Sequence, residues 1–159
     1  MRLILLVSIA LAAGLISAGS WAANPAVGRS QVEAEALRGF EEVLDLWRGE
    51  NYDELYYRLI PSAGSDIWKF VDLMNHSGRK PACCWEKMQD VKLTYVDQKR
   101  VGITAKMGIE VEGVGTRFVT RTFSVVEEEG VWKIPEADII SLAEPNMQRI
   151  PREFLERAP

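Results

Sequence analysis

Arg121 and Asp138 are the two side chains of this sequence whose types and expected positions could support ligand chemistry. The apolar alternation around them places both on the buried face of a predicted sheet, with Glu136 one step away. An unpaired charge would be costly there, so the two groups must find each other, water or a ligand. One interpretation is a partly buried salt bridge between adjacent strands. The other is an arginine at a pocket mouth that holds a carboxylate in its bidentate fork. A bulge at Pro135 would shift Asp138.

The predicted ligand pocket combines this pair with aromatic and apolar side chains. Tyrosines are favoured as pocket residues because a buried hydroxyl needs a hydrogen-bond partner. The competing interpretation is that the aromatic residues, which recur at helix and strand spacing, simply fill the core. The seven predicted pocket residues are Tyr56, Trp68, Tyr95, Met107, Arg121, Phe123 and Asp138.

The only two cysteines, Cys83 and Cys84, are adjacent. Their α-carbons are expected to lie ~3.8 Å apart, below the usual disulfide range of ~4.4–6.8 Å. Three interpretations stay open: two buried small hydrophobic residues, a strained vicinal disulfide, or links to a second chain. The spacing does not support a redox catalyst of the Cys-x-x-Cys kind.

The single histidine, His76, lies at a predicted helix end beside Asn75 and Ser77. One histidine without a nearby cluster of cysteines or carboxylates does not make a zinc-type site. We therefore predict no metal site and no cofactor.

Helical spacing first appears in a long segment that begins at Ser30. Ser30 and Glu33 have the spacing of a capping box, and Gly49 follows the last apolar residue as a stop signal. The expected buried stripe of this helix is Leu37, Phe40, Val43, Leu44 and Trp47.

Two shorter helices are expected before the chain turns to strands. Asn51 can cap the first, which Pro61 ends, and the second begins at Ser65 or Asp66 and stops by Gly78.

The second half of the sequence has the period of two that is typical of strands. Strands are predicted at about residues 88–96, 101–111, 116–127 and 131–142, with one face buried and one in water. Helices followed by an antiparallel meander predict an α+β domain.

The lengths of the turns predict how these strands pair. Three-residue loops are expected at residues 98–100 and 113–115, and a two-residue turn at Glu129-Gly130. These choices agree on one buried face. The predicted cross-strand pairs are Ile109–Val119, Ala105–Phe123, Ile103–Val125, Tyr95–Ile103, Leu93–Ala105, Val125–Ile134, Val119–Ile140 and Arg121–Asp138, with Arg121 beside Met107.

The N-terminus has the composition of a secretory signal peptide. Arg2 is followed by a short apolar run and then by small residues up to Ala22. An uncleaved anchor is the alternative, because crossing a bilayer takes roughly 20 apolar residues. We predict a signal peptide at residues 1–22, a flexible linker at 23–30, the folded domain at 31–143 and a tail at 144–159. The location is then secreted or periplasmic.

The segments at residues 47–56 and 129–134 resemble the cone-shaped α+β superfamily of nuclear transport factor two and ketosteroid isomerase, over roughly residues 31–142. This resemblance implies a cystatin-like cone, in which three helices lie across a curved antiparallel sheet and leave a pocket at the wide end. Its isomerase-type members use a tyrosine from the first helix and aspartates on strands. Here Phe40 and Trp47 occupy that helix stripe, so no catalytic residue is carried over.

These observations favour a non-catalytic domain that binds a small molecule or a partner protein of the cell envelope. The alternative is a small isomerase or dehydratase with a pocket carboxylate as base and a tyrosine as acid. A third possibility is a homodimer that pairs through the outer face of the sheet. The net charge of −4, with no block of basic residues, gives no support to nucleic-acid binding.

Overall fold

The computed structural model describes residues 25–144, which form an α+β domain with a six-stranded, mostly antiparallel open sheet. The predicted signal peptide and all of the predicted tail after residue 144 lie outside the described residues. Within residues 25–144, no helix combines the length and apolarity needed to cross a membrane.

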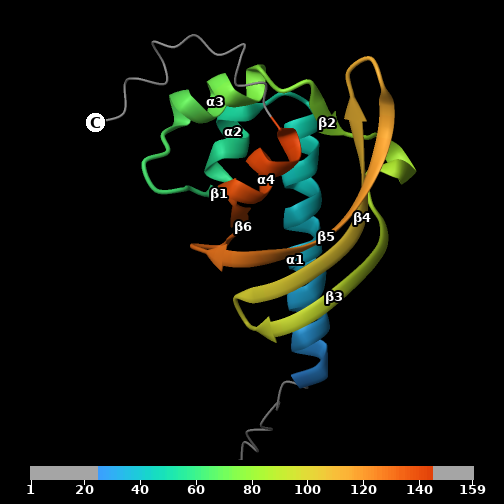
Figure 1. The fold of residues 1–159 in the computed structure, drawn as a ribbon. Coiled ribbons are helices and arrows are strands. Elements are labelled where there is room, and N and C mark those ends of the chain that lie inside the picture. The colour runs from blue at the N-terminus through green and yellow to red at the C-terminus, as the bar shows by residue number, and fades with distance from the viewer. Residues whose placement is uncertain (1–24, 145–159) are drawn as a thin grey trace, which may run out of the picture.

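Three helices come first, and most of the sheet follows them (Figure 1). The helices are α1 (Pro25–Arg48), α2 (Tyr52–Tyr57), α3 (Ile67–Asn75) and α4 (Glu136–Ala143). The strands are β1 (Leu59–Ile60), β2 (Arg79–Pro81), β3 (Gln89–Asp97), β4 (Arg100–Val111), β5 (Gly115–Glu128) and β6 (Val131–Pro135), with a short 3₁₀ helix, η1 (Cys84–Glu86), before β3.

Helix α1 begins earlier than predicted, because it starts at Pro25 instead of Ser30. Proline suits the first helical position, where its missing N–H is not needed. Residues 25–30 are therefore helical. The expected flexible linker was wrong over these residues, and so was the expected helix start at Ser30. The predicted end is confirmed, since the helix stops at Arg48.

Both short helices are present, but the first is shorter than predicted, because α2 ends at Tyr57 and residues 59–60, before Pro61, form β1. The Asn51 side chain makes no capping hydrogen bond. Asn51 precedes α2, and the side chain of Asp66 caps α3 by accepting a hydrogen bond from the Lys69 N–H at 3.0 Å. Phe70 and Met74 are the buried residues of α3.

The sheet has the strand order β1-β6-β5-β4-β2, and β3 also pairs with β4. Only β1 and β6 are parallel. Helix α1 packs against the sheet (Figure 1). Phe40 of the helix meets Phe123 of the sheet, with ring centroids 4.8 Å apart. The predicted buried face is confirmed along β4, from Val101 to Ile109.

The predicted pairing was wrong by two residues in two hairpins, although the faces were right. Ile109 pairs with Arg117, and Val119 pairs with Met107. Arg121 lies opposite Ala105, not beside Met107. The physical reason is the turn, which uses residues 112–114 and allows Gly115, at a φ of 98°, to begin β5.

The hairpin between β3 and β4 shows the same kind of shift. Tyr95 pairs with Val101, and Leu93 pairs with Ile103. Its tighter turn and an irregularity before Asp97 replace the expected three-residue loop. The predicted turn at Glu129-Gly130 is confirmed, because both residues have positive φ values, as this kind of tight hairpin requires.

The largest error concerns residues 136–143, which form α4 and not the end of a strand. Strand β6 stops at Pro135, so Val119 has no partner at Ile140, and Asp138 does not pair with Arg121 across a sheet. The burial of Ile139, Leu142 and Ala143 follows a helical spacing. Proline at the helix entrance fixes the turn from strand to helix.

Candidate functional site

Where α4 ends, the helix-facing side of the sheet carries a pocket of about 270 Å³, which we call the arginine pocket. Strands β2, β4 and β5 and the last turn of α4 contribute to it. Its lining residues are Arg79, Ile109, Val111, Arg117, Val119, Thr120, Arg121, Ser141, Leu142 and Glu144.

The period of two in β5 creates the pocket wall. Arg117, Val119 and Arg121 alternate along the strand and therefore share one face of the sheet. Val119 keeps 37% of its surface exposed, whereas Phe123, further along the same face, is fully buried against α1. This end of the face is thus left partly open.

The arginines of the pocket have unequal partners. Arg121 donates a hydrogen bond to the Ser141 hydroxyl on α4. Arg79 forms an ion pair with Glu144. Among the described residues, the Arg117 guanidinium has no hydrogen-bond or ion-pair partner. The pocket therefore offers one unpaired guanidinium and one that is held by a neutral hydroxyl.

Asp138 lies in the first turn of α4, close enough to Arg121 for an electrostatic effect. Desolvation by burial raises the pKa of Asp138, and the Arg121 guanidinium opposes this shift without cancelling it. The two residues are thus coupled, although not as the cross-strand pair that the sequence predicted.

Glu136 has a structural environment that differs from that of Asp138. It is only 3% exposed, and its carboxylate accepts hydrogen bonds from the Ser62 N–H and the Ser65 hydroxyl, both at 2.7 Å. These contacts tie the loop before α3 to the start of α4. They also occupy both carboxylate oxygens.

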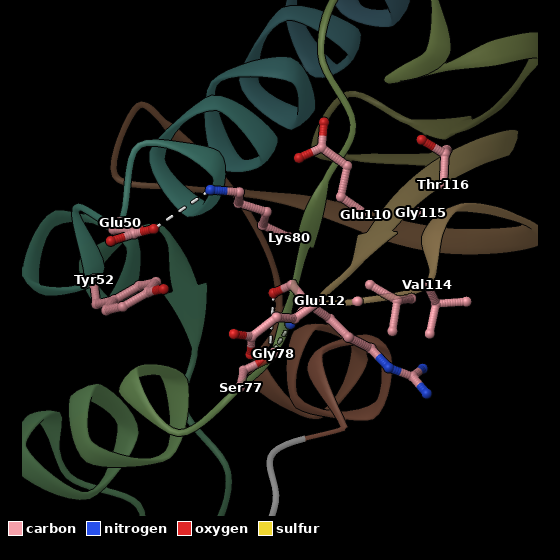
Figure 2. Close-up of a pocket in the computed structure, with 13 residues that line it drawn as sticks. Glu50, Tyr52, Ser77, Gly78, Lys80, Glu110, Glu112, Val114, Gly115 and Thr116 are labelled. Atoms are coloured by element: carbon pink, nitrogen blue, oxygen red, sulfur yellow. Dashed lines mark hydrogen bonds and ion pairs between the residues drawn. The ribbon is translucent and has the colours of Figure 1, made fainter.

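A wider groove of about 820 Å³ adjoins the arginine pocket and shares Arg79 and Val111 with it (Figure 2). Figure 2 shows Glu50, Tyr52 and Lys80 on one side and the tip of the β4–β5 hairpin, with Val114 and Gly115, on the other. The Lys80 ammonium lies 3.6 Å from the Glu50 carboxylate. This edge groove is lined by Glu50, Tyr52, residues 77–80 and residues 110–116.

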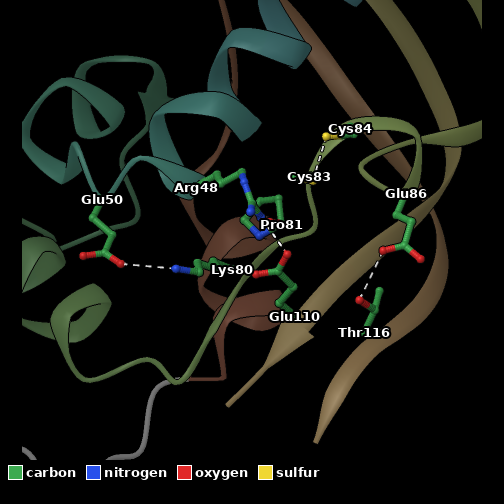
Figure 3. A network of polar contacts seen from close by, with 9 residues as sticks. All are labelled: Arg48, Glu50, Lys80, Pro81, Cys83, Cys84, Glu86, Glu110 and Thr116. Carbon is green, nitrogen blue, oxygen red and sulfur yellow. Dashed lines mark hydrogen bonds and ion pairs between the residues drawn. The ribbon is translucent and has the colours of Figure 1, made fainter. Parts of the chain in front are cut away.

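The charges around the edge groove are largely satisfied within the protein. Arg48 donates hydrogen bonds to Glu110 at 2.9 Å and to the Pro81 carbonyl at 2.6 Å (Figure 3). These contacts join the end of α1 to β2 and β4. The groove therefore has less unused charge than the smaller arginine pocket.

The seven predicted pocket residues do not all lie together. Met107 and Phe123 are buried in the core, and Tyr56 packs on Phe70 with ring centroids 5.6 Å apart. Trp68 is 80% exposed on α3, and the Arg29 guanidinium lies over the ring of Tyr95. Of the seven, only Arg121 lines the arginine pocket, with Asp138 beside it.

The cysteines and the histidine lie outside this pocket. Cys83 and Cys84 are both exposed and unbonded, so the interpretation as buried hydrophobic residues was wrong. A hydrogen bond with Cys84 raises the pKa of the Cys83 thiol. His76 is the C-cap of α3 and contacts the Asp72 carbonyl at 2.7 Å. Residues 25–144 contain no group of three or more side chains that could hold a metal ion.

Sequence reasoning missed Arg79, Arg117 and Ser141 as neighbours of Arg121. Arg117 could have been predicted as a neighbour of Arg121, because it lies four residues earlier on the same strand and therefore shares its face. Arg79 and Ser141 could not, since the first depends on a three-residue edge strand and the second on the unexpected α4.

The sequence matches no protein-family profile. It also has no significant match among curated proteins.

Proposed function

We propose that this chain is a non-catalytic, secreted or periplasmic domain that binds a small amphipathic carboxylic acid in the arginine pocket. This proposal rests on one unpaired guanidinium and one that is held by a neutral hydroxyl, together with the apolar side chains of the same pocket. Within residues 25–144, the Arg117 guanidinium lacks a hydrogen-bond or ion-pair partner, and the Arg121 guanidinium is held by a hydroxyl. Ile109 and Leu142 line the same pocket.

The chemistry of an arginine suits this ligand class. A guanidinium presents a planar fork of donors that matches both oxygens of a carboxylate. The apolar side chains of the pocket would take a short hydrocarbon segment, which gains free energy when it leaves water. Pockets for small molecules typically have volumes of about 300–1,000 Å³, so a pocket of 270 Å³ favours a small acid.

We also propose that the domain is a member of the cone-shaped superfamily named above. The long first helix, the two short helices after it and the strongly bent strands support this assignment (Figure 1). The signal peptide, and with it the location, rests on the sequence pattern of residues 1–22.

The alternative of a small isomerase or dehydratase gains no support from the two carboxylates considered for it. Such an enzyme needs a carboxylate that is free to take a proton from the substrate. Both oxygens of Glu136 are engaged by Ser62 and Ser65, and Asp138 does not line the arginine pocket. We therefore prefer the binding function.

A partner protein of the cell envelope is the second candidate, and exposed aromatic residues favour it. Trp68 on α3 and Tyr57 on α2 leave most of their surface in water. Large exposed aromatic side chains are common at protein interfaces. If this surface binds a partner, Trp68→Ala should weaken that complex and leave acid binding unchanged.

Native mass spectrometry of the exported protein tests the proposed function. The protein should carry a small acid that denaturation releases, and the same spectrum gives the oligomeric state, which tests the possible homodimer. Arg121→Met should lose this mass, whereas Arg100→Met, at the β3–β4 turn, should retain it. Equal retention by both variants would contradict the proposal.

A further inference from the structure

The two cysteine side chains face each other outside the arginine pocket. Their sulfur atoms lie 2.7 Å apart, and both residues are exposed (Figure 3). Figure 3 shows them after β2, where Cys83 is the N-cap of η1 and Cys84 is its first residue. The Arg48–Glu110 ion pair is close enough to act electrostatically on Cys83. Reagents in solution can therefore reach both sulfurs.

An unusual backbone conformation produces this arrangement. Successive side chains of an extended chain point to opposite sides, which would separate the two sulfurs. Cys83 is extended, but Cys84 has a φ of 59° in the left-handed region. Non-glycine residues seldom adopt this conformation unless the surrounding structure imposes it.

Contacts on both sides of the cysteines impose the turn. Before them, the Ala82 N–H donates to the Gly108 carbonyl at 2.8 Å, and Ala82 is fully buried. After them, Thr116 donates to the Glu86 carboxylate at 3.3 Å, and Lys87 pairs with Asp45 at 2.7 Å. The turn is thus anchored to β4, β5 and α1.

Gly108 is needed for this anchoring. A Cβ atom at this position would lie 2.5 Å from the Glu86 carbonyl oxygen. Only a glycine therefore allows η1 to lie so close to the sheet. The sequence thus provides both the space and the contacts that keep the two thiols together.

We propose that Cys83 and Cys84 form a reversible dithiol–disulfide site that exchanges with small disulfides. A thiolate of the pair attacks a sulfur of the donor disulfide RSSR, which forms a mixed disulfide and releases one RS⁻ that takes up a proton. The second thiol of the pair loses its proton and attacks the protein sulfur of this intermediate, which releases the second RSH. The donor is reduced by two electrons, and the pair is oxidised to one Cys83–Cys84 bond.

Thiol counting and peptide mass spectrometry test this proposal on the purified, fully reduced protein. After incubation with excess oxidised glutathione, the protein should lose both titratable thiols and form no disulfide-linked dimers. The tryptic peptide that contains Cys83 and Cys84 should become lighter by two hydrogen atoms and return to its original mass with dithiothreitol.

Single variants distinguish this site from two independent thiols. Cys83→Ser and Cys84→Ser should each keep one glutathione adduct, because no second thiol remains to displace it. Circular dichroism confirms that each variant is folded. Persistent adducts on the parent protein, two thiols that stay free, or disulfide-linked dimers would each overturn the proposal.

Discussion

The guanidinium of Arg121 on β5 donates a hydrogen bond to the hydroxyl of Ser141 on α4. This contact joins the open end of the sheet to the last turn of a helix that covers it. It also orients one arginine that lines the arginine pocket. The position of this side chain therefore depends on the strand, the helix and the turn at Pro135 together.

Replacing the hydroxyl tests whether Ser141 positions the guanidinium. Ser141→Ala should weaken the binding of octanoate by about tenfold, because one hydrogen bond typically contributes ~0.5–1.5 kcal/mol. The unfolding free energy of the Ser141→Ala variant should change by less than about 1 kcal/mol, since Ser141 is exposed. Isothermal titration calorimetry and urea unfolding measure the two effects. Ser124→Ala, on an exposed part of β5, is the control, and equal affinity in both variants would argue against a positioning role.

The pH dependence of the unfolding free energy should reveal the titration of the Asp138 carboxyl group. Its pKa is raised in the folded protein, so the native state binds more protons than the unfolded chain at pH values just above the ordinary aspartate pKa. This contribution stabilises the fold at low pH and is lost as the pH rises through the raised pKa. Asp138→Asn should therefore gain stability relative to the parent as the pH increases from 4 to 7.

Urea unfolding across this pH range measures the Asp138 effect. Asp90→Asn, an exposed position on β3, serves as the control variant. A difference between Asp138→Asn and the parent that shrinks or reverses as the pH rises would contradict the prediction.

Glu136 should be important for stability and not for binding. Glu136→Ala leaves the Ser62 N–H and the Ser65 hydroxyl without their acceptor, and it removes a charge-assisted contact between the loop before α3 and the start of α4. We expect a loss of about 2–4 kcal/mol in unfolding free energy, measured by urea titration. Glu54→Ala, an exposed residue of α2, should cost less than about 0.5 kcal/mol. Similar losses in the two variants would show that these hydrogen bonds contribute little.

Two glycines of α1 should respond in opposite directions to the same substitution. A Cβ atom on Gly39 would lie 2.5 Å from the Cβ of Trp132, whereas one on Gly28 would meet no atom within 4 Å. Gly39→Ala should therefore destabilise the protein by about 1–3 kcal/mol through overpacking. Gly28→Ala should stabilise it by up to about 1 kcal/mol, because alanine favours the helix. Thermal unfolding of both variants decides this, and a neutral Gly39→Ala would mean that α1 does not pack on β6 as described.

The strand faces could be predicted from the sequence, but the strand partners could not. The alternation around Ile103 and Phe123 is a strong signal, because a slip of one residue would expose the whole apolar face. A slip of two residues keeps every side chain on its own face. The pairing within each hairpin therefore depended on the turn alone. The sequence around Gly115 did not indicate that this glycine has a positive φ and begins β5.

Helix α4 was missed because its sequence satisfies two periods at once. Ile134 and Ile140 are an even number of residues apart and could share one face of a strand, while Ile139, Leu142 and Ala143 have helical spacing. The proline at position 135 was the available signal for the change. With α4 unpredicted, Ser141 could not be placed near Arg121, and the pocket appeared to be closed by a strand.

Titration of the protein with octanoate, followed by isothermal titration calorimetry, tests the proposed ligand class most directly. 1-Octanol is the matched neutral probe, since it has the same chain length and no carboxylate. The parent protein should bind octanoate at least tenfold more tightly than octanol, and Arg121→Met together with Arg117→Met should remove this preference. Equal affinity for the two probes, or a preference for octanoate that survives in the double variant, would contradict the proposed function of the arginine pocket.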